Sequence, residues 1–293
     1  MLNENFWCSC VAVIIVYSLG VRLLRVRASV IQPRIIYRLA IALGLAGALP
    51  ASTLAGDFER EKRLTDEVEA NLFSGELVTL DAQGAEFVAV EMASQTNGIR
   101  GVVILLHGRG FHADWPENIG PLRVELSQVG WHTLSLQMPV LEKGAKYLDY
   151  LPLFPEALPR IDAALAYLES QEIRPVVLLA HSCGAHMAMR WLEEHADKSI
   201  DAFIGIGMGA TDYQQPMQRP FPFASLRVPV LDLYGEYDYP AVQRMAPERL
   251  QLITQGGNPA SRQVMAIRAD HYFTGDSDLL IEEITTWLDS LDL

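Results

Sequence analysis

The stretch that most restricts the fold is a serine, Ser182, placed directly between a strand pattern and a helix pattern. Residues 175–180 form a short apolar run typical of a buried strand, and helical periodicity over 183–195 begins without an intervening loop. A turn this sharp leaves room only for small side chains two positions before and after the serine. Those positions hold Ala180 and Gly184, so the pattern is G-x-S-x-G with alanine in place of the first glycine. The sequence therefore predicts a strand-turn-helix unit that presents the Ser182 hydroxyl.

The rest of the chain alternates between strand and helix patterns. We expect a hairpin of strands 76–81 and 86–92, further strands at 101–106, 132–137, 175–180, 202–206, 228–234 and 263–268, and helices at 121–129, 155–170, 183–195, 241–254 and 277–291. This order predicts an α/β fold with helices on both faces of a mostly parallel, twisted sheet. The longest insertions, 139–154 and 209–227, are expected to wall a substrate site and are too short for a large cap domain. We therefore expect one domain over 75–293.

Charge is distributed unevenly along the chain. The 36 acidic residues outnumber the 23 basic ones, and the net charge of −13 argues against nucleic acid or an anionic membrane surface as a partner. Residues 1–55 are the exception, because they hold five arginines and one acidic residue, Glu4. The asymmetry predicts an N-terminal export region, followed by a charged helix over 56–74 that leads into the domain.

Within this N-terminal region, Arg34 and Arg38 precede the apolar run 39–49 and then several small residues. A basic start, a short apolar core and small residues before a cut are typical of a secretory signal peptide. We expect cleavage after Ala55, with Thr53 at the −3 position. A membrane anchor is the alternative, but the run is shorter than the about 20 residues needed to cross a bilayer.

A second apolar run covers 6–21. It is either a membrane helix or translated sequence ahead of the true start, for which Val30 is a candidate, and we favour the second. The protein is expected in the periplasm or outside the cell, with inner-membrane anchoring and membrane contact only if the N-terminal segment is retained. Cys8 and Cys10 lie in the region expected to be removed, which leaves Cys183 as a buried small residue without a disulfide partner.

A serine hydroxyl is a weak nucleophile until a base removes its proton, so Ser182 needs a histidine that is oriented by an acid. Three histidines follow Ser182 in the sequence, His186, His195 and His271, and the two considered as the base are His195 and His271. His195 ends the helix that starts at the serine, about three turns away, and cannot reach back. His271 follows the last predicted strand and is expected to be the base.

The acid should lie in the loop after an earlier strand. Asp238 follows strand 228–234 and a glycine turn, and we expect it to orient His271, with helix N-capping as its alternative role. Glu236 is the nearest rival. The other carboxylates considered and set aside are Asp212, Asp232 and Asp270.

The oxyanion that forms when a carbonyl is attacked needs N–H donors placed in advance, and losing one typically costs about 10²–10³ in rate. One expected donor is the amide of Cys183, at a helix start where the dipole also favours negative charge. The other is expected after the first parallel strand, where the sequence reads His107, Gly108, Arg109. We expect the Arg109 amide to be this donor, with the Gly110 amide as the alternative.

Other polar residues near these positions have two interpretations. His112, Asp114 and Trp115 either line the mouth of the site or anchor a loop. His181, which precedes the serine, is expected to pack under the turn as a structural residue.

Together these features resemble the α/β-hydrolase superfamily over roughly residues 75–291. Four strings are similar to a narrower family of exported bacterial α/β-hydrolase-like proteins of unknown function, DUF3530: Gly108-Arg109-Gly110, Asp114-Trp115-Pro116, Pro121-Leu122-Arg123 and residues 130–139. The resemblance implies an α/β-hydrolase fold and no established substrate.

The leading hypothesis is an exported serine hydrolase that transfers acyl groups from a carboxylic ester, or less readily an amide or thioester, through Ser182, His271 and Asp238. Its substrate would be a small or acyl-containing molecule. The alternative is a catalytically silent envelope protein that uses the fold to bind a ligand or partner, and a peptidase or polymer depolymerase is a third possibility. No metal-ligand spacing or phosphate-binding glycine loop occurs in the sequence, so no metal and no cofactor are expected.

Overall fold

The structure is a computed structural model, and it describes residues 56–293. The predicted export region lies outside the described residues, with its apolar segment 6–21, its signal-peptide-like segment 34–55, the cysteines at 8 and 10 and the cleavage site after residue 55. The charged segment 56–74 contains helix α2 (Phe58–Asn71), whose first turn is capped by the Asp57 side chain.

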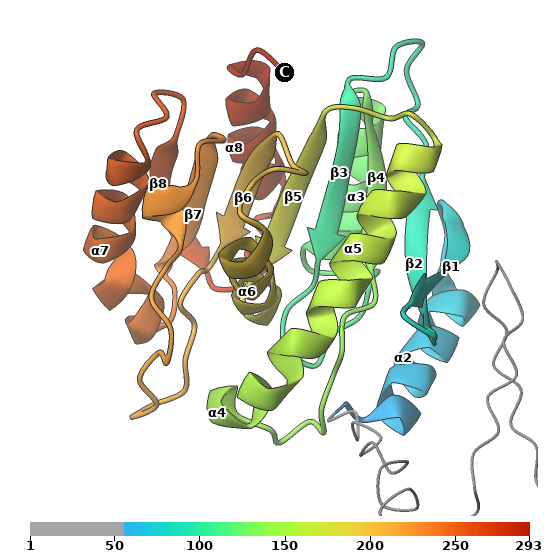
Figure 1. Cartoon of the computed structure of the whole chain (residues 1–293), viewed down its shortest axis with the longest axis horizontal. Helices are drawn as coiled ribbons and strands as arrows, with labels where there is room; N and C mark the ends of the chain where they lie inside the picture. Colours follow the sequence, from blue (N-terminus) through green and yellow to red (C-terminus); the bar gives the residue numbers. More distant parts are fainter. Residues whose placement is uncertain (1–55) are drawn as a thin grey trace, which may run out of the picture. The chain divides into compact units, whose positions relative to one another are not determined.

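The described residues form an eight-stranded sheet in the order β1-β2-β4-β3-β5-β6-β7-β8 (Figure 1). The first two strands form an antiparallel hairpin, β2 pairs antiparallel with β4, and the remaining neighbours are parallel. The strands are β1 (Glu76–Ala82), β2 (Ala85–Met92), β3 (Gly101–Leu106), β4 (Trp131–Leu136), β5 (Val176–His181), β6 (Ala202–Ile206), β7 (Val230–Tyr237) and β8 (Arg262–Asp270). The predicted α/β fold with a mostly parallel sheet is confirmed.

Helices cover both faces of this sheet. Helices α5, α6 and α7 lie on one face, and α3 and α8 lie on the other (Figure 1). Their bounds are α3 (Ile119–Gln128), α5 (Phe154–Ser170), α6 (Cys183–His195), α7 (Pro240–Gly256) and α8 (Ser277–Asp289), and the short helix α4 covers Tyr147–Tyr150.

Because helices cover both faces of the sheet, the sequences of the central strands are continuous apolar runs. On β3, Ile104 and Leu106 belong to the core beneath α5 and α6, whereas Leu105 belongs to the core beneath α3 and α8. A strand buried on both faces has no polar side of its own. Burying each such side chain contributes about 1.5–3 kcal/mol, so the sheet centre is also the stable frame on which the site is built.

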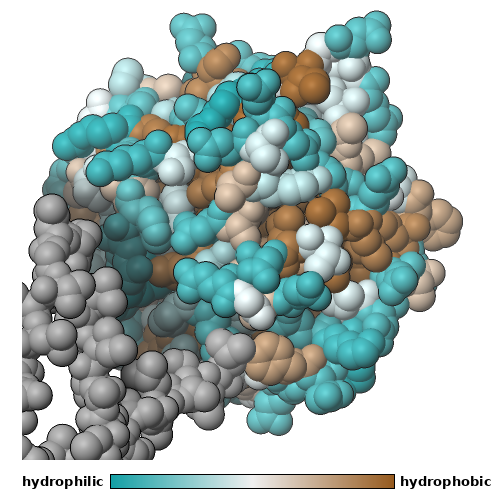
Figure 2. Space-filling view, turned by 45° about the vertical axis from the view of Figure 1, so that its right-hand side comes forward, coloured by the Kyte–Doolittle hydropathy of each residue, from teal (hydrophilic) through white to brown (hydrophobic). Residues whose placement is uncertain are grey.

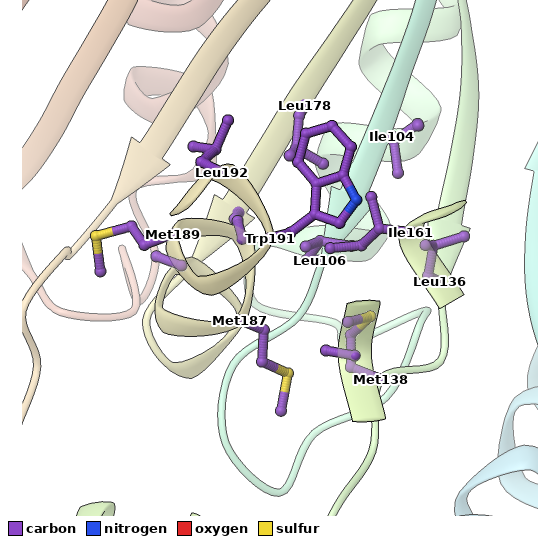
Figure 3. Close-up of a cluster of buried hydrophobic side chains, with 14 of the residues drawn as sticks. Ile104, Leu106, Leu136, Met138, Ile161, Leu178, Met187, Met189, Trp191 and Leu192 are labelled. Atoms are coloured by element: carbon purple, nitrogen blue, oxygen red, sulfur yellow. The ribbon is translucent and has the colours of Figure 1, made fainter. Parts of the chain in front are cut away.

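Helix α6 is seated deeply in the first of these cores. Its Trp191 is 1% exposed and lies among Ile104 of β3, Leu178 of β5 and Ile161 of α5 (Figure 3). Because α6 begins one residue after Ser182, this packing also holds the backbone that carries the serine.

The ends of several elements differ from the sequence prediction. Strand β7 continues to Tyr237, three residues past its predicted end, because it pairs with β8 across an irregularity between Gly235 and Tyr237. The insertion expected as loop over 139–154 contains α4 and a turn of 3-10 helix. Side-chain periodicity carries no information about either feature.

The surface of the described part mixes hydrophilic and hydrophobic side chains, as the face in Figure 2 shows. Within residues 56–293, no helix combines the length and the apolar character that crossing a membrane requires.

Candidate active site

The predicted site residues all follow the carboxyl ends of parallel strands. Arg109 comes after β3, Ser182 after β5, Asp238 after β7 and His271 after β8. Parallel strands end at one edge of the sheet, so residues that are far apart in sequence meet there (Figure 1).

The turn at Ser182 is as tight as the sequence pattern predicts. Ser182 has φ 54° and ψ −113°, which is a costly conformation for a residue with a side chain and is typical of functional sites. A Cβ on Gly184 would lie 2.5 Å from the carbonyl oxygen of His107, so only glycine fits there. Ala180 is fully buried in the same turn, which shows that a methyl group is accommodated where the pattern usually has glycine.

The structure brings Ser182, His271 and Asp238 together. The Ser182 Oγ lies 2.8 Å from His271 Nε2, and His271 Nδ1 lies 2.6 Å from Asp238 Oδ1. All three residues are at most 8% exposed. With an ionised Asp238 at Nδ1, the ring carries its proton there and leaves Nε2 free to accept the serine proton.

Asp238 is held for this contact by two backbone amides. The amide of Tyr239 donates to Oδ1 at 2.6 Å, and that of Gly235 donates to Oδ2 at 3.4 Å. The alternative role for Asp238, as N-cap of α7, falls instead to Tyr239.

The rival residues make other contacts. Asp232 pairs with the buried Arg249, Asp212 pairs with Arg109, Asp270 accepts the amides of Tyr272 and Thr274, Glu236 accepts the amide of Arg268, and His195 bonds the carbonyl of Trp191. The geometry therefore singles out His271 and Asp238 as the groups next to Ser182.

Arg109 and Cys183 line the same cavity as Ser182. The Cys183 amide is the first N–H of α6 and has no acceptor within the helix. Neither amide donates a hydrogen bond to another group of the described residues. Two N–H groups without an acceptor, on residues that line the cavity with Ser182, are donors of the kind that an oxyanion requires.

The cavity at this edge has a volume of about 630 Å³. Both insertions contribute to its wall, the first through Tyr147 and the second through residues 210–216. His186 of α6 also lines it, and its Nε2 donates to the Ala210 carbonyl oxygen at 3.0 Å. His112, Asp114 and Trp115 are not part of this wall. Asp114 pairs with Arg123 of α3 at 2.6 Å, and Trp115 stacks on Phe111, which does line the cavity.

Two tyrosines that the sequence analysis missed surround His271. The Tyr239 ring stacks on the imidazole with 4.1 Å between centroids, and Tyr272 meets it edge-on at 5.0 Å. The two phenol oxygens lie 2.6 Å apart. Each tyrosine directly follows a predicted catalytic residue in the sequence, and this adjacency was the available signal.

Three buried histidines and a buried cysteine near the site are held in their neutral forms. Burial lowers the pKa of His107 and of His181 to about 3, and that of His186 to about 4. Burial raises the pKa of the Cys183 thiol to about 12, so it is not a competing nucleophile. His181 lies under the turn, with Nε2 2.9 Å from the His271 carbonyl oxygen.

Comparison with known proteins places this geometry in a family. The model of a family described as a protein of unknown function (DUF3530) matches residues 50–148 and 156–290. Protein ABHD14A of Danio rerio is 28% identical over 136 residues, which are 46% of this chain and 47% of that protein. The putative protein-lysine deacylase ABHD14B of Homo sapiens is 22% identical over 187 residues, 62% of this chain and 85% of that one.

The chain spans about half the length of the ABHD14A proteins that it matches. Among solved structures, dienelactone hydrolase from Anabaena variabilis superposes with a TM-score of 0.60 over 74% of this chain and 97% of that one, at 21% identity. At this identity the likeness shows a shared fold, in agreement with the strand order.

Proposed function

The chain belongs to the DUF3530 family and to the α/β-hydrolase superfamily, and from this premise we propose that it is a serine hydrolase that cleaves carboxylic esters by acyl transfer. The observation that carries the proposal is the unbroken contact from Asp238 through His271 to the Ser182 Oγ, at 2.6 Å and 2.8 Å.

In the first half of the proposed reaction, Ser182 Oγ attacks the ester carbonyl while its proton moves to His271 Nε2. The negative charge that develops on the carbonyl oxygen is stabilised by the amides of Cys183 and Arg109. His271 then returns the proton to the leaving alkoxide, which departs as an alcohol, and the acyl group stays on Ser182.

In the second half, a water molecule takes the place of the alcohol. His271 removes its proton, the hydroxide attacks the acyl carbonyl, and the carboxylic acid leaves as Ser182 recovers its proton. Asp238 stabilises the imidazolium formed in each half and keeps the ring oriented. The ester and one water molecule are the only reactants, and both proton transfers pass through His271.

The cavity supports a small substrate rather than a polymer. Its volume of about 630 Å³ is within the range of sites for small molecules. The name of the human relative mentions lysine deacylation, so an acylated lysine is a reasonable second substrate to test beside esters.

The direct test is turnover of p-nitrophenyl acetate and butyrate, with covalent labelling by a fluorophosphonate probe. We expect wild type to hydrolyse at least one ester and to be labelled on Ser182, and Ser182→Ala to lose about 10⁶ in kcat and all labelling. Ser199→Ala, the same change at a position remote from the cavity lining, serves as control. A wild-type protein that neither turns over nor reacts with the probe would favour the alternative, a silent envelope protein that binds a ligand.

Export is part of the proposal, because residues 34–55 have the signal-peptide pattern. We expect the protein in the periplasmic or secreted fraction, with its mature N-terminus at residue 56. N-terminal sequencing of the fractionated protein measures this. A cytoplasmic protein that retains residues 1–55 would contradict it, and a membrane-bound one would indicate an anchor.

A further inference from the structure

The second proposed oxyanion donor, the Arg109 amide, lies on a loop between two glycines, Gly108 and Gly110. Gly110 has φ +74°, a conformation open mainly to glycine. Donors contribute to catalysis only when they are placed before the reaction begins. A short glycine-flanked loop does not place itself, so contacts from elsewhere in the chain must hold it.

One end of this loop is held by α2. The Arg60 guanidinium, half-buried, donates from Nη2 to the Gly110 carbonyl oxygen at 3.1 Å. The start of α2 is in turn attached to the domain, because the Asp57 amide donates to the Val140 carbonyl at 2.8 Å. The Asp57 side chain also accepts the Arg60 amide at 2.9 Å.

The other end of the loop is held by His107. Its Nε2 accepts the Met138 amide at 2.9 Å, so the proton lies on Nδ1, which donates to the Gly108 carbonyl oxygen at 2.8 Å. The Gln137 side-chain nitrogen lies 3.0 Å from the same Nε2. His107 thus connects the loop to the chain segment that follows β4.

That segment is connected back to α2 through a buried ion pair. Arg160 of α5 donates to the Gln137 carbonyl at 2.6 Å and pairs with both carboxylate oxygens of Glu61 at 2.7 and 3.1 Å. Glu61 and Arg160 are 8% and 5% exposed. Consecutive residues of one helix, Arg60 and Glu61, therefore act on opposite ends of the same three-residue loop.

We infer that α2, which precedes the first strand of the sheet, positions the oxyanion loop, and that Arg60 is a positioning residue for the reaction. The inference rests on the proposed hydrolase function. According to this inference, the charged helix α2 is part of the active site. The hydrogen bond from Arg60 fixes Gly110 and thereby the direction of the Arg109 amide.

The test compares Arg60→Gln with Arg63→Gln, the same substitution at the next arginine of α2, which is exposed and whose side chain forms no hydrogen bond or ion pair within residues 56–293. We expect Arg60→Gln to lower kcat by about 10- to 10²-fold, since small misplacements of catalytic groups have effects of this size. KM should stay unchanged, because the loop acts on the transition state. Arg60→Lys, which retains a donor, should recover most of kcat, and Arg63→Gln should match wild type.

The melting temperature of each variant separates positioning from folding. A fall in kcat for Arg60→Gln at an unchanged melting temperature supports the inference, and a fall in kcat that merely follows a lower melting temperature overturns it. Equal kcat for Arg60→Gln and Arg63→Gln overturns it as well, while wild-type hydrolysis would leave the proposed function standing. The absence of both turnover and Ser182 labelling in wild type would instead overturn the function itself.

Discussion

The position of Ser182, in the turn between β5 and α6 that we call the elbow, is determined by its neighbours in sequence. A buried strand ends at His181, a helix begins at Cys183, and Gly184 leaves room for the turn. On the other side of Ser182, the loop from Gly108 to Gly110 lies between no two regular elements, and its local contacts are limited to the Gly108 carbonyl oxygen, which accepts from His107 Nδ1 and the Phe111 amide. Its two ends are held by residues 50 positions before it and about 30 positions after it.

The two sides of the site are therefore held in position by different kinds of contact. The elbow is strained at one residue, φ 54° at Ser182, and the strain is borne by two regular elements that pack in the core. The oxyanion loop is held by hydrogen bonds from separate elements. We expect substitutions on the Ser182 side to cause the larger losses of kcat, and substitutions on the loop side to cause smaller, graded losses. Four experiments test this difference.

Of these four experiments, the largest effect is expected at Asp238, the proposed acid. Asp238→Asn should lower kcat by about 10⁴-fold, because the amide that replaces the carboxylate favours the wrong tautomer of His271. Steady-state hydrolysis of the ester that wild type prefers measures this, with Asp278→Asn, on the first turn of α8, as control. If Glu236 or Asp270 were the acid, Asp238→Asn would retain most of its turnover.

On the loop side, Arg109→Pro removes the proposed N–H donor, and Arg109→Ala keeps it. We expect kcat to fall by about 10²–10³ for the proline variant, and far less for the alanine variant, which loses only the ion pair with Asp212 at the cavity wall. Equal losses in the two variants would show that the side chain, and not the amide, contributes to the reaction.

The point where the two sides touch is Gly184, whose Cβ position lies 2.5 Å from the His107 carbonyl and 2.7 Å from the Leu106 carbonyl. Gly184→Ala must push the elbow and the loop apart, and we expect kcat/KM to fall by about 10²-fold. Gly144→Ala is the matched control, because nothing lies within 4 Å of its Cβ position. If Gly184→Ala kept the wild-type kcat/KM, the two backbones would not need to be in contact.

The smallest effect is a pH dependence of the free energy of unfolding. Each side of the site contains a buried neutral histidine, His181 under the elbow and His107 behind the loop. Both have folded pKa values of about 3, below the ordinary 6.5. The unfolded chain then binds more protons below pH 6.5, and the free energy of unfolding falls as the pH drops toward 3. Each histidine contributes at most about 1.4 kcal/mol per pH unit.

Urea unfolding between pH 7 and 5, followed by tryptophan fluorescence, measures this slope. His107→Asn and His181→Asn should each reduce it by up to about 1.4 kcal/mol per pH unit. Slopes that are unchanged in both variants would show that these histidines bind protons equally in the folded and unfolded chain.

The elements with strong periodicity are predictable from the sequence. Helix α6 and strand β6 have the predicted bounds, because continuous apolar runs and a helical apolar face are local patterns. The ends of β7 and β8 are not predictable from the sequence, because their last residues are placed by pairing across an irregularity and not by side-chain alternation. The short helix α4 lies in a segment without periodicity, and only its contacts in the folded chain define it.

For the candidate site, the sequence alone determined the turn at Ser182 and the order in which a histidine and an acid should follow. A turn with small flanking residues is a local steric requirement, and the order of loops follows from a parallel sheet. Only the tertiary structure decided which carboxylate faces His271, that two tyrosines enclose its ring, and that α2 contacts the oxyanion loop. Those choices depend on distances between residues that the chain brings together only when the sheet has formed.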